Sequence, residues 1–233
     1  MKLLIENLTK TYGQKEVLKE IDFEFEEGKI YGLIGRNGSG KTTFFNCLNE
    51  DVEVDKGKMY IENDYGKRRL HTSDIGYVIS TPVVPEFLTA KEFLEFFIDI
   101  NKDKIKDLKT VDEYFDMVSI DKEDQDKLLK EYSHGMKNKM QMLVNIIKKP
   151  NILLLDEPLT SLDVVVQHEM KQLLKDIKKD CICIFSTHIL EIAMDLCDYI
   201  VILNNKTLEL IPKGKLNTKS YKEKIIKALK EEI

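Results

Sequence analysis

The sequence has no apolar run that approaches the roughly 20 residues needed to cross a bilayer, although 42% of its 233 residues are hydrophobic. Its first ten residues, MKLLIENLTK, turn polar after the fifth position and lack the apolar core of a signal peptide. A long repeat and a low-complexity linker are also missing. We therefore expect a soluble cytosolic protein, long enough for one large domain or two modest ones.

Cysteine is scarce, and a net positive charge is absent. The cysteines Cys47, Cys181, Cys183 and Cys197 lack the spacing of zinc ligands, and two of them alternate within the strand-like run CICIF. We interpret them as reduced thiols of a hydrophobic core. The net charge of −5 argues against nucleic acid as the main partner, because proteins that bind it usually carry a basic excess.

Short apolar runs recur along the chain and predict strands. Two of them, ILLLD and ICIFS, are continuously apolar, as expected for central strands buried on both faces. Helical patterns separate the runs, which favours an α/β fold with a largely parallel sheet. The earliest strands could instead form an antiparallel layer.

Residues 89–149 have helical patterns almost throughout, beginning with a capping box at Thr89 and Glu92. We expect a single domain over residues 1–233. Its core spans 1–88 and 150–215, the helical block is inserted at 89–149, and an amphipathic helix closes the chain over 216–233.

The strongest motif is GLIGRNGSGKTTFF, which satisfies G-x-x-x-x-G-K-[ST] directly after an apolar strand. Glycines let backbone N–H groups wrap phosphates, and the following helix directs its positive end at them. Lys41 can reach the β- and γ-phosphates, and the Thr42 hydroxyl can bind Mg²⁺. The motif predicts a nucleoside triphosphate site formed by Gly35, Asn37, Gly38, Ser39, Gly40, Lys41, Thr42 and Thr43.

Acidic residues and a histidine follow two other predicted strands. Asp156 ends the apolar run in NILLLDEPLTSLD, where its carboxylate could hold Mg²⁺ through water. Glu157 follows at once, and is the residue expected to polarise the attacking water. A solvated pair of charges is the alternative. His188 lies just beyond CICIF, at the edge where the phosphate-binding residues gather, and is expected to contact the γ-phosphate.

Together GRNGSGKTT, SHGM, LLLDEP, SLD and STH resemble, in order and spacing, the ATP-binding subunit of an ABC transporter, over about residues 2–211. The resemblance implies an ATP-binding core, an antiparallel β layer and a helical subdomain. It also implies a head-to-tail dimer, homomeric or heteromeric, with two ATP molecules at its interface. Tyr12 matches an aromatic residue that stacks on adenine, and Asp163 matches a loop that crosses the dimer interface.

The segment YSHGM resembles the family signature L-S-G-G-Q, whose helix points at the γ-phosphate bound by the other subunit. Ser133 would cap that helix, and Gly135 has no Cβ to block the phosphate. His134 and Met136 depart from the signature in the manner of bacterial export-type members. An ordinary capped helix is the alternative.

A further departure occurs in IGYVISTP, where the family usually has a glutamine that touches Mg²⁺ or the attacking water. This chain has Ser80, which we expect to act through an added water, with reduced turnover. The metal ligands implied are then Thr42, Asp156 and Ser80.

The function implied is an ATPase that drives a separate membrane permease from the cytoplasmic face of the membrane. A cytoplasmic helix of the permease is expected to dock near Ser80–Phe97. The short segment after Ile211 and the SHGMK sequence favour export, of a peptide, antibiotic or lipid-linked cargo. Two alternatives remain: a soluble ABC ATPase acting on ribosomes or DNA, and an ATP-gated clamp with little turnover.

Overall fold

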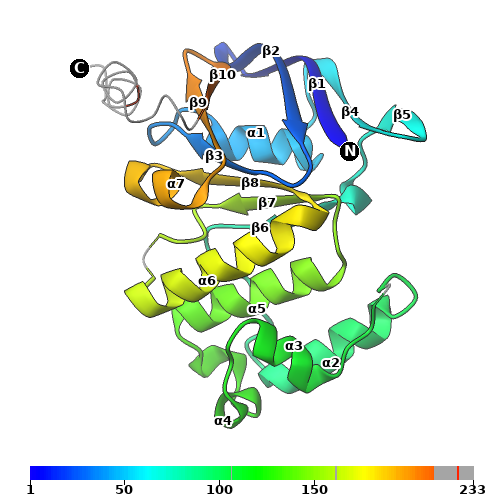
Figure 1. Cartoon of the computed structure of the whole chain (residues 1–233). Coiled ribbons are helices and arrows are strands. Elements are labelled where there is room, and N and C mark those ends of the chain that lie inside the picture. Colours follow the sequence, from blue (N-terminus) through cyan, green and yellow to red (C-terminus); the bar gives the residue numbers. More distant parts are fainter. Residues whose placement is uncertain (106, 161, 213–224, 226–233) are drawn as a thin grey trace.

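The alternation of apolar and polar residues in the strands produces a layered structure, seen in a computed structural model that describes residues 1–105, 107–160, 162–212 and 225. An antiparallel sheet, a mainly parallel sheet and a layer of helices are stacked in that order (Figure 1). The predicted α/β class, with its antiparallel layer and inserted helices, is confirmed.

The antiparallel sheet has the order β2-β1-β4-β5. Its inner face is apolar, so it covers one side of the second sheet, and its outer face carries charged residues. The strands are β1 (Lys2–Tyr12), β2 (Lys15–Glu26), β4 (Lys56–Asn63) and β5 (Gly66–Arg69).

The second sheet has the order β10-β9-β3-β8-β7-β6, and all its pairs are parallel except β10 with β9. As predicted for ILLLD and ICIFS, every residue of β7 and β8 is buried. Alternate residues enter two different cores: Leu153 and Leu155 pack toward the helices, whereas Leu154 packs toward the antiparallel sheet. The strands are β3 (Ile30–Ile34), β6 (Ile75–Val78), β7 (Ile152–Asp156), β8 (Ile182–Thr187), β9 (Tyr199–Asn204) and β10 (Thr207–Pro212).

Helix α1 (Lys41–Leu48) lies between the two sheets, where Phe44 and Phe45 are fully buried. The next helices all fall within residues 89–149: α2 (Ala90–Asn101), α3 (Val111–Met117), α4 (Lys122–Gln125) and α5 (His134–Ile147). They are followed by α6 (Val164–Ile177) and α7 (Leu190–Leu196), and three short 3-10 turns span Thr72–Asp74, Leu129–Glu131 and Lys178–Asp180. The predicted capping box of Thr89 and Glu92 starts α2. The helix predicted over 216–233 lies outside the described residues, apart from Ile225.

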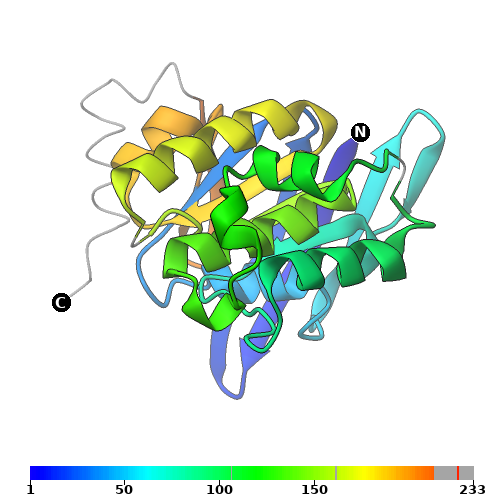
Figure 2. The ribbon, with the colours of Figure 1, turned by 90° about the horizontal axis from the view of Figure 1, so that it is seen from below.

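Helices α5 and α6 lie side by side under the parallel sheet (Figure 2). A partly buried ion pair joins them, with Lys139 Nζ 2.7 Å from Glu169 Oε2, and the same ammonium donates to the Ser119 carbonyl at 2.9 Å. Because removal of Glu169 would leave the buried Lys139 ammonium without its counter-charge, this contact helps to hold the two helices together.

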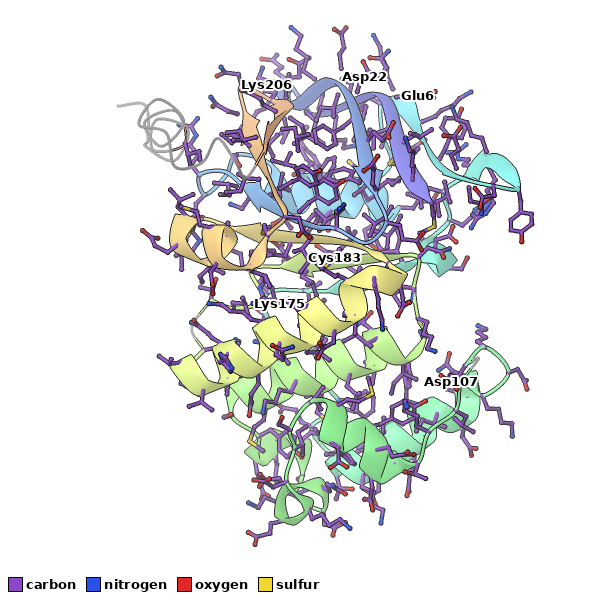
Figure 3. All side chains as sticks on the ribbon, in the orientation of Figure 1. Glu6, Asp22, Asp107, Lys175, Cys183 and Lys206 are labelled. Carbon is purple, nitrogen blue, oxygen red and sulfur yellow. The ribbon has the colours of Figure 1, made fainter. Side chains whose placement is uncertain are left out.

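All four cysteines are buried and free, as expected for core thiols. Figure 3 shows Cys183 in the middle layer, on β8. Burial raises the pKa of this thiol well above its ordinary value, so the reactive thiolate is suppressed. Within the described part of the chain, no helix has the length and apolar character to cross a membrane.

Candidate functional site

The glycine motif forms the turn between β3 and α1. Gly38 has φ +76° and Gly40 has φ +107°, a region that glycine adopts without strain. A Cβ on Gly40 would lie 2.8 Å from Val17 Cγ1, so the close approach of β2 also requires glycine there. The Ser39 hydroxyl oxygen is buried and finds no hydrogen-bond partner among the described residues.

Lys41 opens α1 and is only 7% exposed. Its ammonium donates to the Gly35 carbonyl at 2.8 Å and to the Arg36 carbonyl at 3.3 Å, and lies 3.7 Å from Glu157 Oε1. Burial lowers its pKa, although Glu157 and Asp156 oppose the shift. The loop thus curls around a buried cation that a phosphate could neutralise better than carbonyl oxygens do.

Asp156, at the end of β7, has both carboxylate oxygens occupied. Thr42 Oγ1 donates to its Oδ2 at 2.8 Å, and Ser186 Oγ donates to its Oδ1 at 2.5 Å. Hydroxyl and carboxylate oxygens are the hard donors that Mg²⁺ prefers. Thr42 and Asp156 therefore fit the metal that the motifs imply, and Ser186 orients the carboxylate.

Glu157 faces the same cavity as Asp156, although neighbouring residues of a strand point to opposite faces. It lies just beyond β7 with φ +52°, and this unusual backbone conformation turns its side chain inward. The Glu157 N–H donates to Ser186 Oγ at 2.9 Å, and Thr160 Oγ1 donates to Glu157 Oε2 at 2.8 Å. His188 Nδ1 is 2.8 Å from Oε2.

These groups line one cavity of about 860 Å³, which is large enough for a nucleotide. Most of the predicted residues meet there, including Ser80. Tyr12 contributes its ring at the rim, 47% exposed, with Lys10 Nζ 5.0 Å from the ring centroid. The predicted residues among the lining are Tyr12, Asn37, Gly38, Gly40, Lys41, Thr42, Thr43, Ser80, Asp156, Glu157 and His188.

Five predicted residues lie outside the lining of this cavity: Gly35 and Ser39 of the glycine loop, and Ser133, Gly135 and Asp163 at two helix starts. His134, between Ser133 and Gly135, does line the cavity. Ser133 caps α5, as predicted, by accepting from the Met136 N–H at 3.2 Å. Asp163 caps α6 by accepting from the N–H groups of the second and third residues after it, each at 3.0 Å. Both helix starts are adjacent, because a Cβ on Gly135 would be 3.5 Å from Val166 on α6.

Sequence reasoning missed several residues of the site. Ser186 and Thr160 hold the two acidic residues, and Thr81 adds a second hydroxyl beside Ser80. The signal for Ser186 was a polar residue at the end of an apolar strand, IFST, next to the strand that ends in Asp156. The register confirms the position, since Asp156 pairs with Ser186.

Comparison with known proteins identifies the family. The sequence profile described as ABC transporter matches residues 18–160. An uncharacterised ABC transporter ATP-binding protein of Bacillus subtilis, YxlF, is 33% identical over 92% of this chain and 71% of its own. The bacitracin transport ATP-binding protein of Bacillus licheniformis is 32% identical over 93% and 71%. A probable sulfate/thiosulfate import ATP-binding protein of Chlorella vulgaris is 30% identical over 88% of each chain.

Solved structures agree on the fold. One described as the ATP-binding subunit of an ABC transporter superposes with a TM-score of 0.80 at 23% identity, covering 98% of this chain and 99% of that one. A dimeric ATP-binding cassette in a post-hydrolysis state with ADP and Pi superposes with a TM-score of 0.75 at 22% identity, covering 91% and 98%. The chain thus belongs to the ABC transporter family, as one of its ATP-binding, ATP-hydrolysing members.

Proposed function

We propose that this ATPase binds ATP with Mg²⁺ in the cavity at the ends of β3, β7 and β8, pairs with a second ATPase subunit, and drives a membrane permease. The observation that carries the proposal is the convergence of Lys41, the Thr42–Asp156 pair and the Glu157–His188 pair on one cavity. Lys41 and the loop N–H groups bind the phosphates, and Tyr12 stacks on the adenine.

Mg²⁺ would be held by Thr42 and Asp156, with Ser80 contributing through water. The metal neutralises charge on the phosphate oxygens when bound. Glu157 orients the attacking water, and His188 with Lys41 stabilises the charge that develops on the γ-phosphoryl group. Thr160 and Ser186 hold the Glu157 carboxylate and N–H in place for that step.

Dimerisation is supported by the position of the signature residues. Ser133 and Gly135 stand at the start of α5, and Asp163 stands at the neighbouring start of α6; none of the three lines the cavity of its own chain, although His134 between the first two does. Val164 and Val165 beside them are 82% and 68% exposed, an apolar surface suited to contact with another subunit. We propose that these helix starts close over the ATP bound by the second subunit.

The permease is proposed to dock on the segment from Ser80 through α2. Its exposed apolar residues include Val83, 71% exposed, Phe87, 79%, and Phe96, 58%; Phe93 and Phe97 instead pack against the core. This docking would place the ATPase at the cytoplasmic face of the membrane. Export remains our proposal for the direction, and bacitracin is the first cargo to test because a relative is named for its transport. The import-named relative makes the opposite direction the second candidate.

The proposal is tested by the mass of Glu157→Gln in solution, with and without ATP and Mg²⁺. Glutamine keeps the shape of the side chain and its contact with Thr160, but removes the carboxylate that orients water. We expect a dimer only when ATP and Mg²⁺ are both present, because ATP holds the two subunits together until it is hydrolysed. Glu123→Gln, an exposed change on α4, is the matched control and should stay monomeric.

A monomer under all conditions would contradict closure by this subunit alone. Direction is tested separately in inside-out vesicles that contain the chain and a co-expressed permease. An exporter accumulates bacitracin in such vesicles when ATP is added outside, whereas an importer does not.

A further inference from the structure

The outer edge of β6 contacts side chains of α5 instead of another strand. β6 is the last strand of its sheet and pairs with β7 on its inner side. Its outward N–H and C=O groups would otherwise be left without partners, which is costly in a buried position. Figure 1 shows α5 in the helical layer below the parallel sheet, and a side chain of α5 reaches the Tyr77 N–H of β6.

Two carboxamide side chains make the contact. Asn145 Oδ1 accepts from the Tyr77 N–H at 3.0 Å, and its Nδ2 donates to the Gln141 carbonyl at 2.8 Å. With its amide oriented to satisfy both partners, Gln141 Nε2 donates to the Ile79 carbonyl at 3.3 Å and Oε1 accepts from the Ile79 N–H at 3.2 Å. Gln141 is 8% exposed, so these bonds are what satisfy its buried amide.

The backbone is shaped for this close approach. A Cβ on Gly76 would lie 3.0 Å from Pro150 Cγ and 3.4 Å from Asn145 Cβ. The first distance is tighter than an ordinary contact and the second is at its lower limit, so the glycine leaves room for Pro150 and the end of α5 beside β6.

Protection of the sheet edge accounts for only part of the arrangement. β6 ends at Val78, and the bond to the Tyr77 N–H lies within it. The two bonds of Gln141 are made to Ile79, beyond the last residue of the strand. They fix the segment that leaves the sheet, and the next residue is Ser80.

The same strand also contacts the phosphate-binding helix. The Tyr77 hydroxyl donates to Asn46 Oδ1 on α1 at 3.1 Å. The end of β6 is therefore held by α1, which starts at Lys41, and by α5, which starts beside Gly135. A shift of α5 relative to the sheet would move Ile79 and Ser80 with it.

We propose that Gln141 is a positioning residue for ATP hydrolysis: it holds Ile79, and through it Ser80, at the cavity in register with α5, while Asn145 holds Tyr77 two residues earlier. This inference rests on the proposed function of Ser80 at the metal and the attacking water. Through the bonds of Gln141 to Ile79, the position of α5 determines where the Ser80 hydroxyl lies in the cavity.

The test is a double-mutant cycle of Gln141→Met and Ser80→Ala, measured as kcat and KM for ATP at saturating Mg²⁺ on the full chain. Gln141→Met keeps the length of the side chain and removes both bonds to Ile79. We expect it to lower kcat about tenfold, less than the roughly 100-fold that a misplacement of about 1 Å can cost, because Ser80 acts only through water. KM should change by less than about twofold. In the Ser80→Ala background the same change should lower kcat by less than about twofold, because there is no hydroxyl left to position.

Gln172→Met is the matched control, because Gln172 bonds Asp176 within α6 and is expected to leave kcat unchanged. An equal loss of kcat in both backgrounds, or no loss in either, would overturn the positioning role. Ser80→Ala alone tests the proposed function: wild-type turnover there would overturn the role of Ser80 and the positioning inference together. If Gln141→Met does not fold, Gln141→Glu, which keeps the acceptor for the Ile79 N–H but not the donor, takes its place with the same criteria.

Discussion

Gly135→Ala should have opposite effects on the stability of the folded chain and on the ATP turnover of the proposed dimer. Gly135 is in the first turn of α5, where glycine is about 0.5–1 kcal/mol worse than alanine. An added Cβ would lie 3.5 Å from Val166 Cγ1 and 3.6 Å from Leu162 Cδ2, which are ordinary contact distances. The chain itself therefore has room for the methyl group, and we expect the variant to unfold about 1–4 °C higher.

ATP turnover should move in the opposite direction. In the proposed dimer the first turn of α5 meets the γ-phosphate on the other subunit, and a methyl group there would displace it from the helix N–H groups. Loss of one such donor costs about 10²–10³ in kcat in well-studied enzymes, so we expect at least a tenfold fall. Binding of ATP to the isolated chain should be unchanged, because Gly135 does not line its cavity.

The assay is phosphate release at saturating ATP over a range of protein concentrations, alongside thermal unfolding. Gly66→Ala is the matched control: Gly66, in the β4–β5 hairpin, has φ +122° and open space around its Cα. It should lose about 1 kcal/mol of stability and keep its turnover. A Gly135→Ala protein that is stable and fully active would refute the proposed contact with the partner's phosphate. A Gly135→Ala protein less stable than wild type would refute the claim that the folded chain can accommodate the added methyl group.

Three further outcomes follow from individual contacts. Gly40→Ala should weaken ATP binding at least tenfold in a fluorescent-nucleotide titration, because φ +107° and the 2.8 Å contact with Val17 force the loop to shift; unchanged affinity would contradict this. Ser186→Ala should lower kcat about tenfold and stability by about 1–2 kcal/mol, since it frees both Asp156 and the Glu157 N–H; wild-type turnover would contradict it. Burial alone would raise the pKa of Asp74, but hydrogen bonds led by Arg68 hold it below its usual 3.8. The contribution of the Asp74 carboxylate to the free energy of unfolding is then present above about pH 4 and lost as the pH falls through the lower folded-state pKa. Urea unfolding should therefore show wild type more stable than Asp74→Asn at pH 6, with a difference that shrinks toward pH 2.5. A constant difference would contradict the assignment.

The parts of the fold that depend on local patterns were predictable. The glycine motif carries its own strand, turn and helix, and the buried strands β7 and β8 are continuously apolar. Strand β2 contains no continuous apolar run, because its apolar residues Ile21, Phe23 and Phe25 alternate with acids and only the inner face is apolar. Such an alternation predicts a strand with one buried face, but it is a weaker signal than a continuous apolar run.

The site was predictable where one residue follows one strand, and less so where two strands meet. Lys41, Asp156 and His188 each lie at the end of a recognisable strand or loop. The role of Ser186 depends on β8 being the neighbour of β7, and that of Gln141 on α5 covering the edge of β6. Local sequence patterns predict neither of these neighbours, because the order of strands in a sheet depends on the packing of the whole chain.

The geometry also supports the different roles proposed for the two adjacent acids. Asp156 is 4% exposed, and each of its oxygens accepts a hydroxyl hydrogen bond, so it is fixed as a ligand and has little freedom to move a proton. Glu157 escapes the alternation of the strand only through φ +52°, a conformation that costs a non-glycine residue about 1–3 kcal/mol. Ser186 at its N–H and Thr160 at its carboxylate offset that cost. Because strain of this kind persists only where surrounding contacts hold it, the serine and threonine are part of what fits Glu157, rather than Asp156, for the proposed role of orienting the attacking water.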